Sequence, residues 1–158
     1  MTTISRPSRQ APALVRRSNA LTSRLLRLGL PMGPNGLLTV RGRTTGEPRT
    51  APVAVVEIDG HRYLMGAYGD VQWTRNLRAA GEADFSLHGR TEHVIARELE
   101  GADAVAFFRD TLPEFIGRLP WFGRAFSKTF LPLVGPELLK DPDAAVASHP
   151  VFELRRIG

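Results

Sequence analysis

Apolar and polar positions along residues 37–98 follow the short period of β-strands. Residues 50–58 are apolar at almost every position, which is typical of a strand that is buried on both faces or curled into a barrel. Asp59-Gly60 is a strong hairpin-turn signal, and His88-Gly89-Arg90 is a second turn. We therefore expect strands over Leu37–Val40, Thr50–Ile58, His61–Ala67, Ala83–Leu87 and Thr91–Glu98.

Helical signals lie between and after these strands. Residues 70–80 predict a short helix, with Asp70 as its N-cap and Gly81 directly after its end. We expect a second helix over residues 102–112 and a closing strand over His149–Leu154. Five prolines between residues 113 and 143 favour short apolar helices, because proline interrupts long ones. The whole pattern predicts an α+β fold, a small β-barrel of about six mostly antiparallel strands with flanking helices.

The beginning of the chain has a different character. Residues 1–10 are polar, and residues 12–28 place leucines at helical spacing with arginines mostly on the other faces, which predicts a basic amphipathic helix. That helix either packs on the domain or rests on an anionic membrane surface. We expect a tail and helix over residues 1–30, followed by a single domain over residues 31–158.

Composition excludes several classes of protein. The 158 residues contain no cysteine, so a disulfide scaffold, a thiolate zinc site, an iron–sulfur cluster and cysteine catalysis are excluded. No apolar run reaches the ~18 residues of a membrane-spanning helix, and the start lacks the pattern of a secretory signal peptide. We expect a cytoplasmic protein, with peripheral contact at the inner face of the cell membrane if the first helix binds lipid.

Basic residues are concentrated near the start. Residues 1–50 contain nine arginines and one acidic residue, Glu47, whereas residues 51–158 contain twelve basic and fifteen acidic residues. This asymmetry indicates an anionic partner for the first third of the chain. Nucleic acid is not the expected partner, because residues 1–50 contain no aromatic side chain that a base would stack on.

Side chains that would carry acid–base, nucleophilic or metal chemistry are not clustered. The four histidines are scattered, and no serine lies in a nucleophile elbow, so no catalytic residue and no metal site are predicted. The connection at residues 42–50 instead combines two glycines, three threonines and two arginines, the groups that bind phosphate, although a charged hairpin loop would look the same. Residues 66–77 suggest one wall of a pocket for a flat ring, or simply a helix whose Trp73 and Leu77 face the core.

The segment at residues 33–99 closely resembles the deazaflavin-dependent nitroreductase family, the split β-barrel oxidoreductases that use coenzyme F420, an 8-hydroxy-5-deazaflavin. The matching elements are Leu38-Thr39, Gly42-Arg43 with Gly46 and Arg49, Thr50-Ala51-Pro52-Val53, Asp59-Gly60, and Trp73 with Asn76-Leu77. The resemblance implies a split barrel of the FMN-binding-like type and F420 as the cofactor.

The same resemblance implies residue roles in cofactor and substrate binding. The anionic tail of the cofactor would contact Arg43, Thr44, Thr45 and Arg49. The ring would be lined by Thr50, Ala51, Pro52, Val53 and Ala54, bordered by Met65, Gly66, Ala67 and Tyr68, and completed by Gln72, Trp73, Thr74, Arg75 and Asn76. The Phe-rich stretch at residues 113–135 is a candidate lid or a helical cap, and the candidate substrate contacts are Tyr68, Trp121 and Phe122.

The expected activity is hydride transfer between F420 and a small or apolar acceptor, namely a quinone, an activated double bond or a nitro compound. The alternatives are a non-catalytic F420 carrier and an FMN-binding split-barrel oxidoreductase. Nitroimidazole activation does not transfer from the family, because this chain has only two tyrosines, Tyr63 and Tyr68. The resemblance also implies a homodimer.

Overall fold

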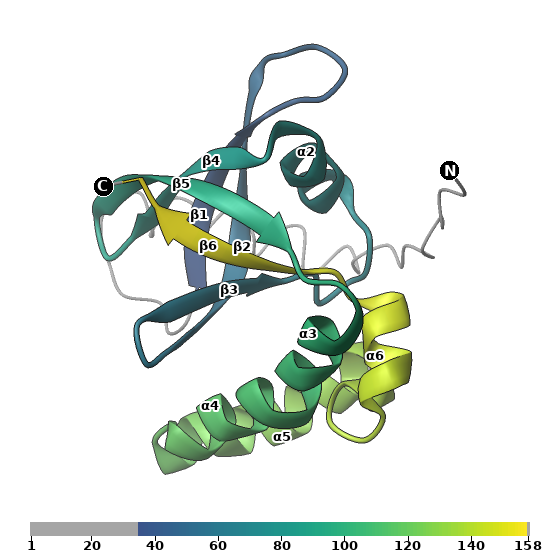
Figure 1. Cartoon of the computed structure of the whole chain (residues 1–158). Coiled ribbons are helices and arrows are strands. Elements are labelled where there is room, and N and C mark those ends of the chain that lie inside the picture. Colours follow the sequence, from purple (N-terminus) through teal and green to yellow (C-terminus); the bar gives the residue numbers. More distant parts are fainter. Residues whose placement is uncertain (1–34, 158) are drawn as a thin grey trace.

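The computed structural model describes residues 35–157. Six strands form a closed barrel in the order β1-β2-β3-β6-β5-β4, and every neighbouring pair is antiparallel (Figure 1). The strands are β1 (Asn35–Arg41), β2 (Pro48–Ile58), β3 (His61–Met65), β4 (Glu82–Leu87), β5 (Arg90–Glu98) and β6 (Val151–Arg156). The prediction of a six-stranded antiparallel barrel is confirmed.

Two tight turns set the register of the hairpins. At Asp59-Gly60 both residues have positive φ, 50° and 79°, and this turn joins β2 to β3. His88 and Gly89, with φ of 50° and 77°, join β4 to β5 in the same way. Such turns have the twist that suits antiparallel strands, so the local sequence fixes which residues face each other in each hairpin.

Helices cover one side of the barrel and one of its flanks. Figure 1 shows α3, α4, α5 and α6 gathered beneath the barrel, whereas α2 (Gln72–Ala80) lies beside it and packs against β1, β4 and β5. The lower group consists of α3 (Gly101–Ala106), the π-helical η1 (Phe107–Thr111), α4 (Leu112–Arg118), α5 (Trp121–Val134), the short η2 (Pro136–Leu138) and α6 (Pro142–Ser148). None of the helices in the described part of the chain is both long and apolar enough to cross a membrane.

Two hydrophobic cores result from this arrangement. One fills the barrel and includes Leu38, Val53, Val55 and Phe85. The other lies between the barrel and the lower helices, and its members include Phe107. Strand β2 contributes to both cores, because successive side chains point to opposite faces of a strand.

The helical predictions need two corrections. Asp70 is not the N-cap of α2: the helix begins after Val71, and the Asp70 carboxylate accepts a hydrogen bond from the Thr74 side chain instead. The lower helices are longer than predicted, because the chain remains helical through Pro113 to Arg118. The π-helical turn directly before Pro113 widens the backbone there, which relieves the clash that proline makes with the preceding turn.

The other predictions for this region agree with the structure. Gly81 ends α2 in the left-handed conformation, as expected. In α5, Pro132 lies in the last turn and therefore does not divide the helix. The helix predicted over residues 12–28, with its two alternative environments, lies outside the described residues.

Candidate functional site

A small polar cavity of about 370 Å³ lies between the β1–β2 connection and α2. The connection contributes backbone and hydroxyl groups, and α2 contributes two amides and an indole. The lining residues are Gly42, Arg43, Thr44, Thr45, Arg49, Thr50, Ala51, Gln72, Trp73 and Asn76. Half of the predicted cofactor contacts, from two segments more than twenty residues apart in sequence, are therefore together in one cavity.

Amide side chains hold Arg43 in place. Its Nη1 donates to Gln72 Oε1 at 2.9 Å and to Asn76 Oδ1 at 2.8 Å, and its backbone N–H donates to the same Asn76 oxygen at 3.2 Å. Among residues 35–157, no carboxylate pairs with this guanidinium. Arg43 is thus oriented by neutral groups and keeps its full positive charge for an anion.

The backbone of the connection is folded by its own hydrogen bonds. Gly42 N donates to the Glu47 carbonyl at 2.8 Å, and Gly46 N donates to the Gly42 carbonyl at 2.9 Å. Gly46 has a φ of 75°, which favours glycine. Arg49 is exposed and lies 3.5 Å from Glu47, so its charge is less available to a ligand than that of Arg43.

The donor set of the small cavity fits the anionic end of a cofactor. Guanidinium and hydroxyl groups are the usual partners of phosphate and carboxylate oxygens, and no acidic side chain lines this cavity. Trp73 and Ala51 add apolar surface beside these donors. The arrangement therefore accommodates a molecule with a charged end and a flat, apolar part.

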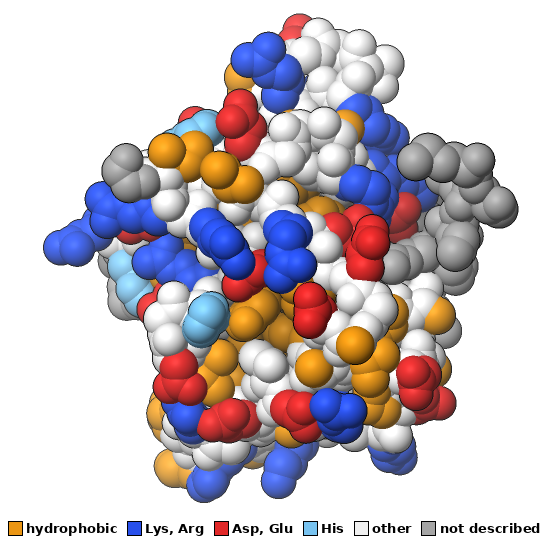
Figure 2. Space-filling view, in the orientation of Figure 1, with side chains coloured by type: hydrophobic (Ala, Val, Ile, Leu, Met, Phe, Trp, Pro, Cys, Tyr) orange, Lys and Arg blue, Asp and Glu red, His pale blue; other side chains and the backbone are white. Residues whose placement is uncertain are grey.

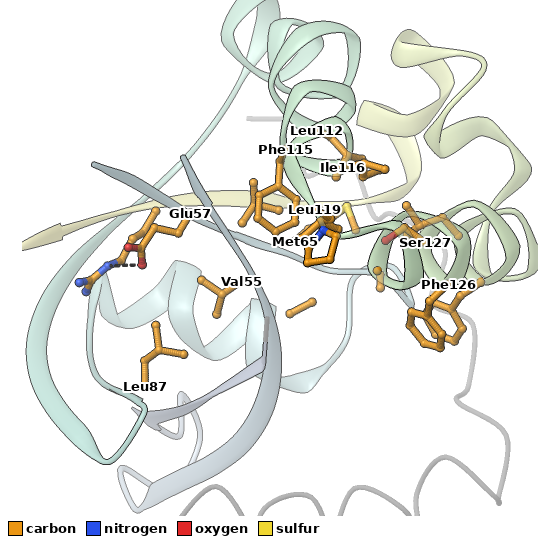
Figure 3. A pocket seen from close by; sticks show the side chains of 18 of the residues that line it. Val55, Glu57, Met65, Leu87, Leu112, Phe115, Ile116, Leu119, Phe126 and Ser127 are labelled. Atoms are coloured by element: carbon orange, nitrogen blue, oxygen red, sulfur yellow. Dashed lines mark hydrogen bonds and ion pairs between the residues drawn. The ribbon is translucent and has the colours of Figure 1, made fainter. Parts of the chain in front are cut away.

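A second and larger cavity, of about 900 Å³, lies between the barrel and the lower helices. Figure 3 shows Val55 and Leu87 on the barrel side, Leu112 and Phe115 on α4, and Phe126 with Ser127 on α5. The lining is mostly apolar, and many of its side chains are large. This cavity is suited to a hydrophobic molecule rather than to a charged one.

One edge of the large cavity is charged. There Arg62 donates to Glu57 at 3.1 Å and to Glu92 at 2.7 Å, and the guanidinium of Arg62 lowers the pKa of Glu92. All three side chains line the cavity. These charges are already compensated by one another, in contrast to the charge of Arg43.

Compensated charges are also typical of the barrel surface. Figure 2 shows basic and acidic side chains interleaved across the face drawn there. Arg78 contacts both Asp70 and Glu98, and Arg97 donates to Glu153 at 3.0 Å. Burial raises the pKa of Asp70, but the hydrogen bonds from Thr74 and Arg78 and the charges of Arg78 and Arg75 outweigh it, so this pKa is lowered overall.

The remaining predicted site residues are divided among three places. Ala54, Met65, Ala67 and Phe122 line the large cavity. Pro52 and Val53 lie on β2 between the two cavities, and Val53 is buried in the barrel core. Gly66 and Tyr68 belong to the segment after β3, where Tyr68 packs against the core beneath the barrel and burial raises its pKa.

Three predicted contacts point elsewhere. Thr74 is buried and hydrogen-bonded to Asp70, and Arg75 pairs with the same carboxylate at 3.4 Å, so neither lines a cavity. Trp121 is 75% exposed and lies outside the large cavity. All three share a helix with true lining residues, but helical geometry turns neighbouring side chains to different faces.

Sequence analysis missed most of the α4 and α5 lining. The Phe-rich stretch at residues 113–135 suggests a lid, but its sequence does not separate inward from outward positions. The missed residues include Leu112, Phe115, Ile116, Leu119, Phe126, Ser127 and Phe130.

Comparison with known proteins identifies a family. A family model described as F420H(2)-dependent quinone reductase matches residues 7–116. None of the curated proteins matches the chain significantly.

Solved structures resemble the chain at low sequence identity. An F420-H2 dependent reductase has 20% identity and a TM-score of 0.48, over 77% of this chain and 94% of its own. A structure described as a domain-swapped dimer has 21% identity and a TM-score of 0.50, over 92% and 100%. A protein of unknown function from Agrobacterium tumefaciens has 18% identity and a TM-score of 0.51, over 98% and 58%. The last two show the same fold.

Proposed function

Because the chain belongs to the F420H(2)-dependent quinone reductase family, we propose that it reduces a quinone bound in the large apolar cavity. The family establishes that the protein is an F420-dependent reductase, so it is an enzyme rather than a non-catalytic carrier. The acceptor is the part that we infer from the cavities. An activated double bond and a nitro compound are the competing acceptors.

The small cavity would bind the anionic tail of the cofactor. Arg43 and Arg49 would bind the charged tail, and the hydroxyls of Thr44, Thr45 and Thr50 would donate to its oxygens. When bound, reduced F420 supplies a hydride from its ring, so the chemistry that the protein must add is small. The sequence predicts no acid–base pair, which agrees with a protein that binds and orients the reactants while the cofactor supplies the hydride.

The observation that carries the proposal is that β2 contributes to both cavities. Thr50 and Ala51 line the polar cavity, and Ala54 and Val56 line the apolar one. Only Pro52 and Val53 separate them, about 10 Å of extended strand. A cofactor bound by its tail in the first cavity would have β2 as a shared wall leading to the second cavity, so β2 residues would hold its ring beside the acceptor.

The residues of the large cavity would orient the acceptor and exclude water. Ala54 and Ala67 leave room beside β2 and β3, whereas Phe115 and Phe126 present flat faces from the helices. Holding two reactants together in a dry site contributes strongly to the rate of a transfer reaction. The volume of about 900 Å³ suits a quinone with part of an apolar side chain better than a compact nitro compound.

The first experiment is a pair of titrations followed by turnover. We expect purified protein to change the fluorescence of F420 on binding and to bind FMN far more weakly. With reduced F420, we expect a quinone with an isoprenoid side chain to give a higher kcat/KM than a nitroarene or an enone of similar reactivity. Equal kcat/KM for all three acceptors would refute quinone as the preferred one.

A pair of variants locates the acceptor. Ser127→Phe on α5 fills the large cavity and is expected to raise the quinone KM roughly tenfold, with the F420 Kd unchanged. Thr129→Phe adds the same ring on the exposed side of the same helix and should behave as wild type. An unchanged KM in Ser127→Phe would move the acceptor elsewhere.

The assembly and domain proposals are independent of the acceptor. We also propose that residues 31–158 form one cofactor-binding domain and that the protein is a cytoplasmic homodimer. Sedimentation of the purified protein at several concentrations tests the dimer.

A further inference from the structure

The outer face of α5 is apolar and basic. Trp121 is 75% exposed, Phe122 61%, Phe126 66% and Leu133 80%. A helix that packs on a protein normally turns polar side chains outward and its apolar stripe inward. In α5 the inward side includes Leu131 and Val134, whereas Phe122, Phe126 and Leu133 form an exposed apolar edge next to it and Trp121 lies farther round on the solvent side.

The exposed rings are contiguous. The Trp121 and Phe122 ring centroids are 5.9 Å apart, and Phe126 stacks on Phe130 at 5.3 Å. Phe122 and Phe126 are four residues apart and therefore neighbours on one side of the helix. With about 200 Å² for a fully exposed aromatic side chain, the three exposed rings present on the order of 400 Å² of apolar surface. A patch of this size marks an interaction site rather than ordinary surface.

The charge on the exposed side of α5 has one sign, and its basic residues lie next to Trp121, on the edge opposite Phe122 and Phe126. Residues 121–134 contain Arg124 and Lys128 and no acidic residue. Both cations are exposed, and neither has an acidic partner within residues 35–157. Elsewhere on the described surface arginines are mostly paired with carboxylates, so this helix differs in charge as well as in hydropathy.

We propose that the outer face of α5 docks on the surface of an anionic lipid bilayer. Aromatic and aliphatic side chains beside unpaired cations are the composition of helices that lie in the plane of a bilayer interface. Phe122 and Phe126 belong to this face and also line the large cavity. Docking therefore places the mouth of that cavity at the lipid, where apolar quinones dissolve; only this last consequence rests on the proposed function.

Vesicle flotation of the full chain tests the docking. We expect binding to vesicles of phosphatidylcholine with phosphatidylglycerol and weak binding to phosphatidylcholine alone. Trp121→Ser/Leu133→Ser removes apolar surface outside the cavity, and Arg124→Glu/Lys128→Glu reverses the charge. The charge reversal should lower the partition coefficient roughly tenfold or more, because one basic side chain near an anionic surface contributes about a factor of five. Trp121→Ser/Leu133→Ser should lower it by roughly tenfold as well, because interfacial binding scales with the apolar area that is buried.

Matched controls change other parts of the surface. Ile95→Ser removes a side chain that is 50% exposed on β5, and Arg155→Glu/Arg156→Glu reverses two exposed charges on β6. Both should bind vesicles like wild type. In a Trp73→Phe background, Trp121 is the remaining tryptophan, and brominated lipids should quench its emission.

Three outcomes would overturn the proposal. In the first, the α5 variants bind vesicles like wild type. In the second, only deletion of residues 2–30 abolishes vesicle binding. In the third, sedimentation without lipid shows a dimer that Trp121→Ser/Leu133→Ser dissociates, so that a second copy of the chain is the occupant of this face. Arg124→Glu/Lys128→Glu should still reduce a water-soluble, short-chain quinone at the wild-type rate and lose activity only on quinone in vesicles. Vesicle binding by a wild-type protein that reduces no quinone would refute the proposed acceptor and leave the docking intact.

Discussion

Replacing Arg43 by alanine is the sharpest test of the small cavity. The guanidinium is held by Gln72 and Asn76 and has no acidic partner among the described residues. Arg43→Ala removes this charge from the cavity and leaves Arg49 as the remaining cation in its lining. We expect weaker binding of F420 with little change in stability, because Arg43 is exposed.

The magnitude follows from the type of contact. Hydrogen bonds to charged groups contribute about 1.5–3 kcal/mol each, and exposure to solvent favours the lower end of that range. A loss of about 1.5–2 kcal/mol corresponds to an increase in Kd of roughly 10- to 30-fold. The difference from wild type should shrink as salt is added, since exposed charges are screened.

A second substitution separates charge from shape. Asn76→Asp is nearly isosteric and keeps an oxygen acceptor beside Arg43, but it adds a carboxylate that compensates the guanidinium charge. We expect a loss of F420 affinity comparable to that of Arg43→Ala, although Arg43 itself is retained. If Arg43 contributed only apolar contacts to F420, Asn76→Asp would leave the F420 affinity unchanged.

Fluorescence titration of F420 at low and high salt measures these effects, with Arg41→Ala as the matched control. Arg41 is an exposed neighbour on β1 that does not line the cavity. If Arg43→Ala and Arg41→Ala bind F420 equally well, the anionic tail is not bound here and the assignment of the small cavity is wrong.

Three further predictions concern the scaffold around the site. Asp70→Asn should lower the free energy of unfolding by about 1–3 kcal/mol at pH 7. Since the pKa of Asp70 is lowered in the folded state, its contribution to stability is present above about pH 4 and is lost as the pH falls below that value. The stabilities of wild type and Asp70→Asn should therefore converge in acid denaturation curves. Gly66→Ala should lower the melting temperature and weaken F420 binding, because the added Cβ would lie 2.8 Å from the Gly69 carbonyl oxygen and the segment must shift; normal melting and affinity would show that the segment adapts freely. His149→Ala should lower the free energy of unfolding measured in urea by about 2–3 kcal/mol, since the buried ring hydrogen-bonds the Gly66 carbonyl and the Glu137 carboxylate, each at 3.0 Å. A loss below about 0.5 kcal/mol would show that water replaces these bonds.

The strands and hairpins were predictable because their signals are local. Asp59-Gly60 and His88-Gly89 have the residue types that positive φ demands, and the apolar run of β2 reflects burial on both faces. The closure of the barrel was not visible locally, since β1–β4 and β3–β6 pair residues far apart in sequence. The prediction of Asp70 as N-cap was wrong, because its carboxylate accepts hydrogen bonds from the side chains of Thr74 and Arg78 on α2 rather than from a backbone N–H at the start of the helix.

The candidate site was predictable in its composition but not in its division into two cavities. The phosphate-binding character of residues 42–50 is evident from their side chains, whereas the identity of the cofactor came from the family resemblance. The orientation of Thr74, Arg75 and Trp121 was missed, because a short segment does not reveal which side of a helix packs inward. The large cavity forms only when α4 and α5 fold back over β2 and β3, which no local pattern encodes.

The position of β6 has a consequence for synthesis of the protein. Until residues 151–156 leave the ribosome, the other five strands can form only an open sheet in the order β3-β2-β1-β4-β5. Its two edges would offer unpaired backbone groups to other nascent chains. The helices α3–α6 are translated before β6, so they can pack against the open sheet before β6 pairs with β3 and β5 and closes the barrel.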